Sequence, residues 1–404
     1  MHTGEAAITA LNEPGRSPER PAWQAVFSMS LGVFGLVTAE FLPASLLTPM
    51  AADLKVTEGV AGQAVTATAA VALITSLLIA TATRRIDRRH VLLAFSMLLI
   101  ASNLLVAFAP SLPALLLGRV LLGIAIGGFW TMSAATAMRL VPEHMIPRAL
   151  SIMFSGVSAA TIVAAPVGSY LGGLIGWRNV FLLATALGVL ALLWQLATLP
   201  RMAPSGHTRL GTLLDVLKRP GIGWGMFAVI LVFTGHFAFF TYLRPFLETV
   251  TGVGVNALSA ILLGFGVANF IGTSAAGFML ERNLRLTLAL MPLLMGTLGL
   301  GLAASGSAPY ADSAMVALWG FAFGTVPVGW STWITRNVPD EAESAGGLIV
   351  AAVQLAIALG AAAGGAVFDL SGALGVFTGS GLTLLIATVL VLLGLRPRRA
   401  AVPA

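Results

Sequence analysis

Apolar runs of about twenty residues or more recur along the whole chain, and short polar segments rich in proline or arginine separate them. A helix needs about 20 apolar residues to cross the hydrocarbon layer of a bilayer. Prolines between the runs mark where such helices end. The pattern therefore predicts an all-α membrane protein with twelve spans, at 25–50, 60–83, 91–109, 112–141, 149–175, 180–199, 221–250, 257–280, 284–304, 314–334, 345–370 and 375–395.

Basic residues are concentrated on one of the two sides that twelve crossings define. If the N-terminus is cytoplasmic, eighteen of the 22 Lys and Arg residues fall in inside segments and three in outside segments, while Arg119 lies within a span. Short cytoplasmic loops of membrane proteins carry such an excess of positive charge. We therefore expect both termini in the cytoplasm, with the chain in the cytoplasmic (inner) membrane.

The chain also divides into two similar halves. The longest interior polar stretch, 200–220, separates six spans from six. Arg-Leu-Val-Pro at 139–142 matches Arg-Asn-Val-Pro at 336–339, and Pro43 matches Pro245 at nearly the same offset. Internal repeats of this kind are typical of transporters whose site lies between the halves. We expect a cytoplasmic tail at 1–22, a first half at 23–199, a cytoplasmic linker at 200–220, a second half at 221–395 and a cytoplasmic tail at 396–404.

Composition narrows the function. Hydrophobic residues make up 57% and charged residues 9% of the chain, whereas a soluble domain is about a quarter charged. There is no cysteine, so a disulfide framework or a thiolate metal site is excluded, and we expect no cofactor. The net charge of +6 lies mostly in short loops, which favours contact with anionic membrane lipid over nucleic acid. No phosphate-binding Gly-x-x-x-x-Gly-Lys-Ser/Thr sequence and no set of catalytic residues indicates an enzyme.

Glu40 is the one carboxylate of sixteen Asp and Glu that lies deep inside a span. An ionisable group in the membrane is costly and normally faces a cavity with a function. Burial favours its neutral form and a nearby cation its charged form. Glu40 is therefore the expected proton carrier, and a carboxylate that only ties two helices together is the structural alternative.

Two further ionisable residues lie within spans. Arg119 keeps its charge, so it suits tuning an acid or hydrogen-bonding the backbone of the first span, unless it only packs between helices. His236, within the seventh span, can serve as a second proton site, contact a polar edge or a hydroxyl group of a substrate, or hydrogen-bond between helices.

Aromatic and amide side chains gather on spans four, seven, eight, ten and eleven. A ligand with a flat ring can stack on aromatic side chains, and a nucleobase gains about 1–3 kcal/mol per base in this way. The alternatives are interfacial anchors for the rings and hydrogen bonds between helices for the amides. The candidate substrate contacts are Trp130, Phe237, Phe240, Tyr242, Asn269, Trp330 and Gln354.

Several motifs resemble the drug/proton antiporter branch of the major facilitator superfamily. Asp87 and Arg88 lie in the Arg-Arg-Ile-Asp-Arg-Arg loop after span two, although Thr83 stands where the family has Gly. Arg119 is followed by Gly123 and Gly127 at four-residue spacing, as in the family's fourth helix. The resemblance implies two six-helix halves, and it links Arg119 to proton coupling.

The fifth and sixth spans continue this resemblance. Ala-Ala-Pro-Val-Gly at 164–168 places Pro166 and Gly168 at the branch's helix-five kink, with Ala165 in place of the usual Gly. Gly-Trp-Arg at 176–178 is also typical of the branch.

Four segments are more closely similar to the bacterial exporters of purine ribonucleosides within this family. They lie at 40–43, 128–133, 237–245 and 327–336. The resemblance implies a monomeric, proton-coupled antiporter that exports nucleosides such as inosine and guanosine. Export of sugars or drugs by the same fold, or uncoupled facilitation, are the alternatives.

Overall fold

The computed structural model describes residues 21–142, 145–203, 210–305, 308–338 and 342–394. Within these ranges the regular structure is helical. The expected terminal tails fall almost wholly outside the described residues, and so does 204–209 of the expected linker. The first half contains α2 (Trp23–Ser45), α3 (Leu47–Leu54), α4 (Glu58–Ala61), α5 (Gln63–Ala82), α6 (Arg88–Ala107), α7 (Leu112–Leu140), α8 (Ile146–Ile175) and α9 (Trp177–Thr198). The linker and second half contain α10 (Leu210–Leu217), α11 (Ile222–Thr241), α12 (Leu243–Thr249), α13 (Val255–Ser305), α14 (Pro309–Asn337) and α15 (Ala342–Gly394).

Ten described helices are long and apolar enough to cross a membrane, and two of them are too long for one crossing. Helix α13 has 51 residues and α15 has 53, whereas about 20 residues suffice. Each is interrupted by a residue with non-helical backbone angles, Asn283 in α13 and Gly372 in α15. Gly372 has φ +68°, a conformation that glycine adopts without steric cost. Each long element is therefore a pair of spans, which gives the predicted twelve crossings.

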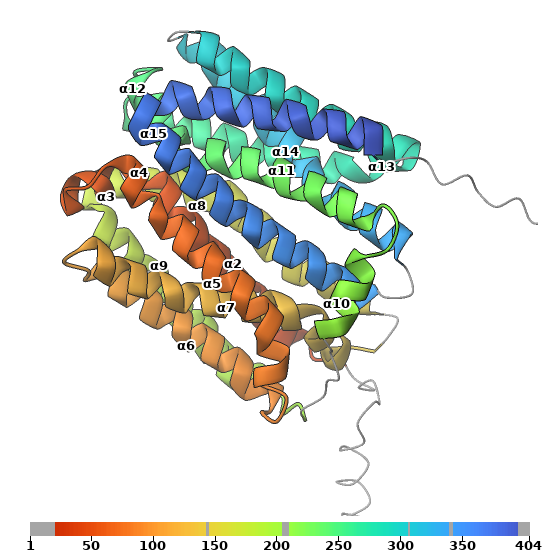
Figure 1. The fold of residues 1–404 in the computed structure, drawn as a ribbon. Coiled ribbons are helices and arrows are strands. Elements are labelled where there is room, and N and C mark those ends of the chain that lie inside the picture. Colours follow the sequence, from red (N-terminus) through yellow and green to blue (C-terminus); the bar gives the residue numbers. More distant parts are fainter. Residues whose placement is uncertain (1–20, 143–144, 204–209, 306–307, 339–341, 395–404) are drawn as a thin grey trace, which may run out of the picture.

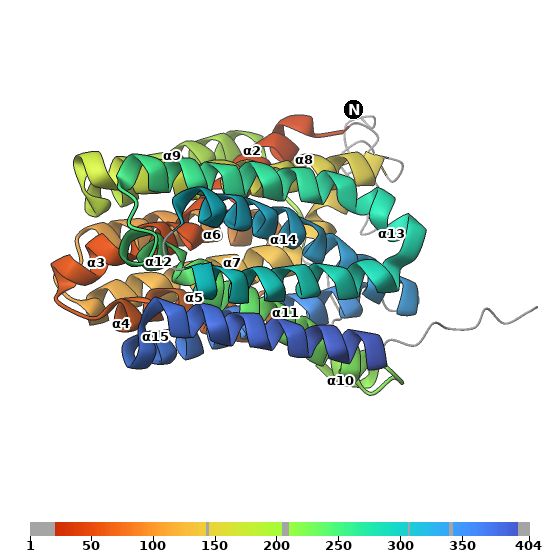
Figure 2. The ribbon, with the colours of Figure 1, turned by 90° about the horizontal axis from the view of Figure 1, so that it is seen from above.

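The two halves lie side by side (Figure 1), with α2 to α9 in one group and α11 to α15 in the other. They meet along two helix pairs: α5 packs on α15, and α8 packs on α13. Helix α10 lies at one end of the molecule, where α2 also begins and α15 ends (Figures 1 and 2). We call this the linker end. Helices α3, α4 and α12 lie at the opposite end, which we call the far end.

The first and seventh spans are broken at matching places. Helix α2 ends at Ser45 and continues, after a break at Leu46, as α3. Helix α11 ends at Thr241 and continues, after Tyr242, as α12. Discontinuous helices at corresponding positions of two repeats mark functional regions of transporters. The breaks therefore agree with the pseudo-symmetry expected from the sequence.

The outward surface suits lipid. Large apolar side chains on α9 and on the last part of α15 are exposed, including Leu190 and Leu193 of α9 and Ile386 and Leu393 of α15. Hydrocarbon is the solvent that such a surface requires. The chain is therefore a multi-pass membrane protein.

Two glycines after Arg119 bring α7 close to α5. A Cβ atom on Gly127 would lie 2.3 Å from the carbonyl oxygen of Ala72, and one on Gly123 would lie 2.5 Å from that of Thr68. Backbone cannot move aside as a flexible side chain can. Both positions therefore need glycine for close helix contact.

We expect Gly127→Ala to lower the thermal unfolding midpoint in detergent by several degrees, because overpacking a tight contact costs about 1–3 kcal/mol. The matched control is Gly264→Ala on α13, where an added Cβ meets nothing within 4 Å. Equal midpoints for the two variants would contradict this account of the α5–α7 contact.

Candidate functional site

Glu40 lies on α2 at the boundary between the halves. Its side chain is half-buried, and the ring of its neighbour Phe41 meets the ring of Phe240 on α11 edge-on, with centroids 5.4 Å apart. Within the described chain, no side chain hydrogen-bonds to or ion-pairs with the Glu40 carboxylate. A carboxyl group in this position is free to gain and lose a proton without breaking a structural bond.

Arg119 binds the backbone beside Glu40 and forms no hydrogen bond with its carboxylate. It is fully buried on α7, and its Nη1 donates to the carbonyl oxygen of Ala39 at 2.8 Å. Its Nε donates to the carbonyl of Ala64 on α5 at 3.1 Å, and Nη2 lies 3.5 Å from the carbonyl oxygen of Glu40. One guanidinium thus joins three helices, as its fixed fork of donors allows.

Pro43 explains why Ala39 accepts this bond. In a helix, the carbonyl of residue 39 pairs with the N–H of residue 43, and proline has no N–H. Helix α2 continues through Pro43, so the Ala39 carbonyl loses its partner inside the helix. Arg119 supplies the missing donor. The arginine therefore fixes the position of the backbone that carries Glu40.

His236 lies on α11, inside the second half. Its Nδ1 accepts a hydrogen bond from Nε1–H of Trp319 at 3.1 Å, and its ring stacks on Phe323. The side chain is 2% exposed. With Nδ1 occupied as an acceptor, the ring carries its proton on Nε2, and the arrangement is the interhelical hydrogen bond that the sequence left as one alternative.

The candidate substrate residues lie in several different environments. Trp130 and Asn269 are half-buried. Phe237 and Phe240 are buried, Phe237 against Phe323 of α14 and Phe240 against Phe265 of α13. Trp330 is 1% exposed and packs edge-on against its neighbour Trp333.

Two others take distinct environments. Gln354 on α15 is 4% exposed, and its Oε1 has no partner among the described residues. Tyr242 lies in the break between α11 and α12 at the far end.

The motif residues of the first half hold its linker end together. Asp87 caps α6 by accepting from the N–H of Arg89 at 2.8 Å, and it also accepts from the N–H of Met202 at 3.0 Å. The N–H of Arg88 donates to the carbonyl of Met202 at 3.0 Å. The chain leaving α9 is therefore tied to the loop between α5 and α6.

The kink motif lies on α8. Pro166 is inside the helix, and Gly168 lets α8 approach α2, because a Cβ there would lie 2.7 Å from Cδ2 of Leu42. The motif positions thus serve contact between neighbouring helices.

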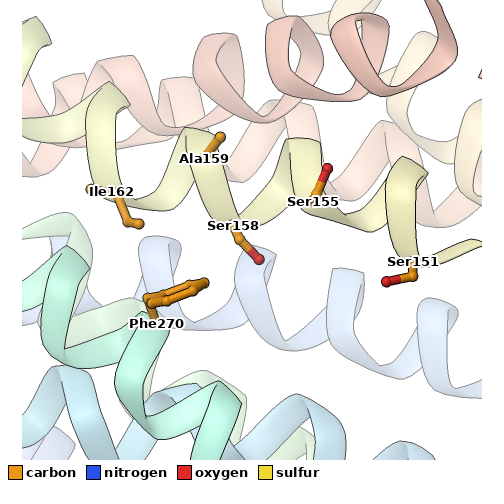
Figure 3. Close-up of a pocket in the computed structure, with 6 residues that line it drawn as sticks. All are labelled: Ser151, Ser155, Ser158, Ala159, Ile162 and Phe270. Carbon is orange, nitrogen blue, oxygen red and sulfur yellow. The ribbon is translucent and has the colours of Figure 1, made fainter. Parts of the chain in front are cut away.

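A cavity of about 500 Å³ opens between α8 and α13, in the part of α8 nearest the linker end. Typical small-molecule sites occupy about 300–1,000 Å³. Figure 3 shows Ser151 and Ser158 on the side of α8 where the ring of Phe270 lies. The lining residues are Ser151, Ser155, Ser158, Ala159, Ile162 and Phe270.

The face of α8 that carries Ser151 and Ser158 continues along the helix as the face that touches α13. Nearer the far end, Gly266 of α13 packs so closely on the backbone of Ile162 that an added Cβ would lie 2.8 Å from its Cα. The two helices therefore touch near the middle of α8 and separate toward the linker end. The hydroxyl groups and an aromatic ring sit where they separate, which suits a ligand with both hydroxyls and a flat ring.

Sequence reasoning missed these lining residues and one buried acid. Serines at positions 151, 155 and 158 repeat at helical spacing in an otherwise apolar span, which is a readable signal. Asp312 on α14 is fully buried and accepts from the hydroxyls of Thr251 at 2.8 Å and Ser305 at 2.6 Å. Its place near the helix start gave no sign of this burial.

We expect a double-mutant cycle to couple Arg119 and Pro43. Arg119→Met leaves the Ala39 carbonyl without a donor, whereas Pro43→Ala restores an N–H to the helix. The loss from Arg119→Met should shrink in the Pro43→Ala background, with a coupling free energy of about 1–2 kcal/mol from unfolding in detergent. Pro292→Ala, in the other half, is the control and should be additive with Arg119→Met. Additive effects in both cycles would refute the assignment.

Comparisons with known proteins agree with this geometry. The sequence model described as "Major Facilitator Superfamily" matches residues 29–361. Proteins named "Purine ribonucleoside efflux pump NepI" from Salmonella paratyphi C and Salmonella typhimurium are each 48% identical over 372 residues, covering 92% of this chain and 94% of the relative. The human organic anion transporter MFSD10 (TETRAN) has a similar fold, with TM-score 0.67 and 17% identity over 92% of this chain and 100% of that one. The chain therefore belongs to the Major Facilitator Superfamily of membrane transporters.

Proposed function

We propose that this protein exports purine ribonucleosides such as inosine and guanosine across the bacterial cytoplasmic membrane, in exchange for protons. The 48% identical relatives bear the name of purine ribonucleoside efflux pumps, and the similarity spans nearly the whole chain. The observation that carries the coupling is Glu40, a carboxyl group without a bonding partner in the described chain, at the boundary between the halves.

The orientation rests on charge. The loop between α5 and α6, the end of α7 and the linker lie at the linker end and hold the arginine clusters, including Arg84, Arg85, Arg89 and Arg139. Positive loops stay in the cytoplasm. We therefore place the linker end and both termini inside the cell. The cavity between α8 and α13 then faces the cytoplasm, as an exporter needs for loading.

The proton supplies the energy without a nucleotide. A proton moving down about 100 mV gains roughly 2.3 kcal/mol, and one pH unit adds about 1.4 kcal/mol. Each 1.4 kcal/mol is tenfold in concentration, so one proton sustains a gradient of several hundredfold for a neutral solute. Antiport follows if Glu40 carries the proton when the substrate is absent and releases it when the substrate binds.

The cavity suits the two chemical parts of a nucleoside. Ribose hydroxyls pair with hydroxyls such as those of Ser151 and Ser158, and a purine stacks on a ring such as Phe270. Phe270 is 47% exposed, so its face is open to a ligand. Export of sugars would use the serines without the ring, which makes Phe270 the residue that separates the two substrate classes.

The remaining roles complete the proposal. The protein works as a monomer in lipid, needs no cofactor and binds no nucleic acid. A passive facilitator is the second candidate, and an unpaired carboxyl at the boundary favours coupled transport over it. The family and the names of the relatives favour transport over an enzymatic role.

We expect Glu40→Gln to abolish proton-driven uphill export of inosine in proteoliposomes and to keep inosine exchange down its own gradient. Glutamine keeps the shape and cannot carry the proton. Glu281→Gln, an exposed glutamate on α13, is the matched control and should retain uphill export. Uphill export by Glu40→Gln with unchanged pH dependence would show that another group carries the proton.

We expect Phe270→Ala to raise the KM for inosine by about tenfold, in line with the loss of one base–aromatic stack. The maximal rate should change less, and KM for arabinose should not change. Phe278→Ala is the control, because Phe278 is 60% exposed on the same helix and stacks with Arg282 outside the cavity. An equal rise in KM for both variants would remove Phe270 from the substrate site.

A further inference from the structure

Two hydrogen bonds and one polar contact of a tyrosine hydroxyl join described residues of the two halves, and all three lie at the far end. The hydroxyl of Tyr242 points at the carbonyl oxygen of Gly59 at 3.4 Å, and Nη1 of Arg244 donates to the carbonyl of Ser45 at 2.5 Å. The hydroxyl of Thr57 donates to Oδ2 of Asp369 at 3.0 Å. The far end is thus closed by specific bonds, whereas the linker end has the cavity between α8 and α13.

Tyr242 fills a socket built from glycines of both halves. The residue is fully buried, its hydroxyl also lies 3.0 Å from the carbonyl oxygen of Ala361, and its ring stacks on Phe368. A Cβ on Gly62 of the first half would lie 2.1 Å from the Tyr242 hydroxyl oxygen, and one on Gly365 of the second half 2.6 Å. The ring therefore fits only because neither position has a side chain.

Arg244 of the second half donates across the boundary to a second backbone carbonyl of the first half that lacks an N–H partner in its own helix. The residue four positions after Ser45 is Pro49, which has no N–H to donate to the Ser45 carbonyl. Arg244 is 5% exposed, donates to this carbonyl, and forms an ion pair with Glu248 at 2.8 Å. A hydrogen bond from a charged donor is among the stronger ones in proteins.

We propose that Tyr242 and Arg244 form the gate on the external side of the transport path, and that Tyr242 is a gating residue instead of a substrate contact. The proposal rests on the orientation and alternating access given above. Release of substrate to the outside requires the halves to part at the far end, so these bonds must break in each cycle. The glycines around Tyr242 allow the ring to return.

The gate is connected to Glu40 along α2. Glu40 and Ser45 lie on the same helix, and Phe41 contacts Phe240, two residues before Tyr242. Parting of the halves at the far end therefore removes the Phe240 ring from beside Glu40 and opens that side of the boundary. This connection gives a physical route by which the external solution reaches the proton carrier only when the gate is open.

The absence of cysteine makes the gate directly measurable. Ala51→Cys on α3 places a thiol at a site that is 2% exposed and packs against the second half at the far end. Ser151→Cys places one in the cavity at the linker end. Labelling of each single-cysteine protein by a membrane-impermeant maleimide in lipid nanodiscs, with both faces accessible, reports which end is open.

We expect Gly62→Ala to speed labelling at position 51 about tenfold and to slow labelling at position 151, because the new methyl group keeps the Tyr242 ring out of its socket. Adding Tyr242→Phe removes the hydroxyl oxygen that meets this methyl group, so labelling at position 51 should fall back toward the parent rate. Arg244→Gln in a protein that keeps Gly62 should also speed labelling at position 51. Gly264→Ala, which meets nothing within 4 Å, is the control and should leave both rates unchanged.

Parent labelling rates in folded Gly62→Ala protein would overturn the proposal. So would faster labelling at both positions, which indicates general loosening, or a failure of Tyr242→Phe to reverse the effect. Each protein is first shown to be monodisperse by gel filtration. The assay uses neither nucleoside nor a proton gradient, so its outcome stays separate from that of the transport experiments on Glu40 and Phe270.

Discussion

Two prolines in the first span leave two backbone carbonyls without their helical partners, and buried arginines take both. Pro43 frees the carbonyl of Ala39, which accepts from Arg119 of the same half. Pro49 leaves the carbonyl of Ser45 without an N–H, and Arg244 of the other half donates to it. An unpaired backbone carbonyl is costly where water is excluded, so these bonds fix the helix that carries Glu40. The bond from Arg119 lies within one half, so it is kept when the halves move. The bond from Arg244 crosses the boundary between the halves.

The two arginines therefore have different roles. Arg119 keeps the backbone of Glu40 attached to α5 and α7 whichever way the halves tilt. Arg244 holds the other end of the same segment only while the far end is closed. Because neither guanidinium ion-pairs with the Glu40 carboxylate, the carboxyl can change its charge without breaking the fold. Glu40, the proposed proton carrier, thus lies between a permanent attachment and one that alternates.

Much of the architecture was predictable because hydropathy and charge act locally. Twelve spans, the repeat and the depth of Glu40 all follow from the sequence of single segments. The freed carbonyls of Ala39 and Ser45 were also implied by Pro43 and Pro49, but which cation takes each depends on helix packing. Arg244 counted only as an outside charge, and Tyr242 as a ring for stacking, because the socket between Gly62 and Gly365 combines residues some 300 positions apart. The hydrogen bond between His236 and Trp319 could not be predicted for the same reason, because it joins residues far apart in the sequence.

The central claim is that Glu40 carries a proton in the absence of substrate and releases it when the substrate binds. The most direct measurement is proton release when inosine is added to the purified protein in weakly buffered detergent solution, followed with a pH indicator. The account predicts net release of protons when inosine binds, although no membrane and no proton gradient are present. Saturable binding of inosine with no net proton release, across the whole pH range in which the protein stays folded, would contradict it.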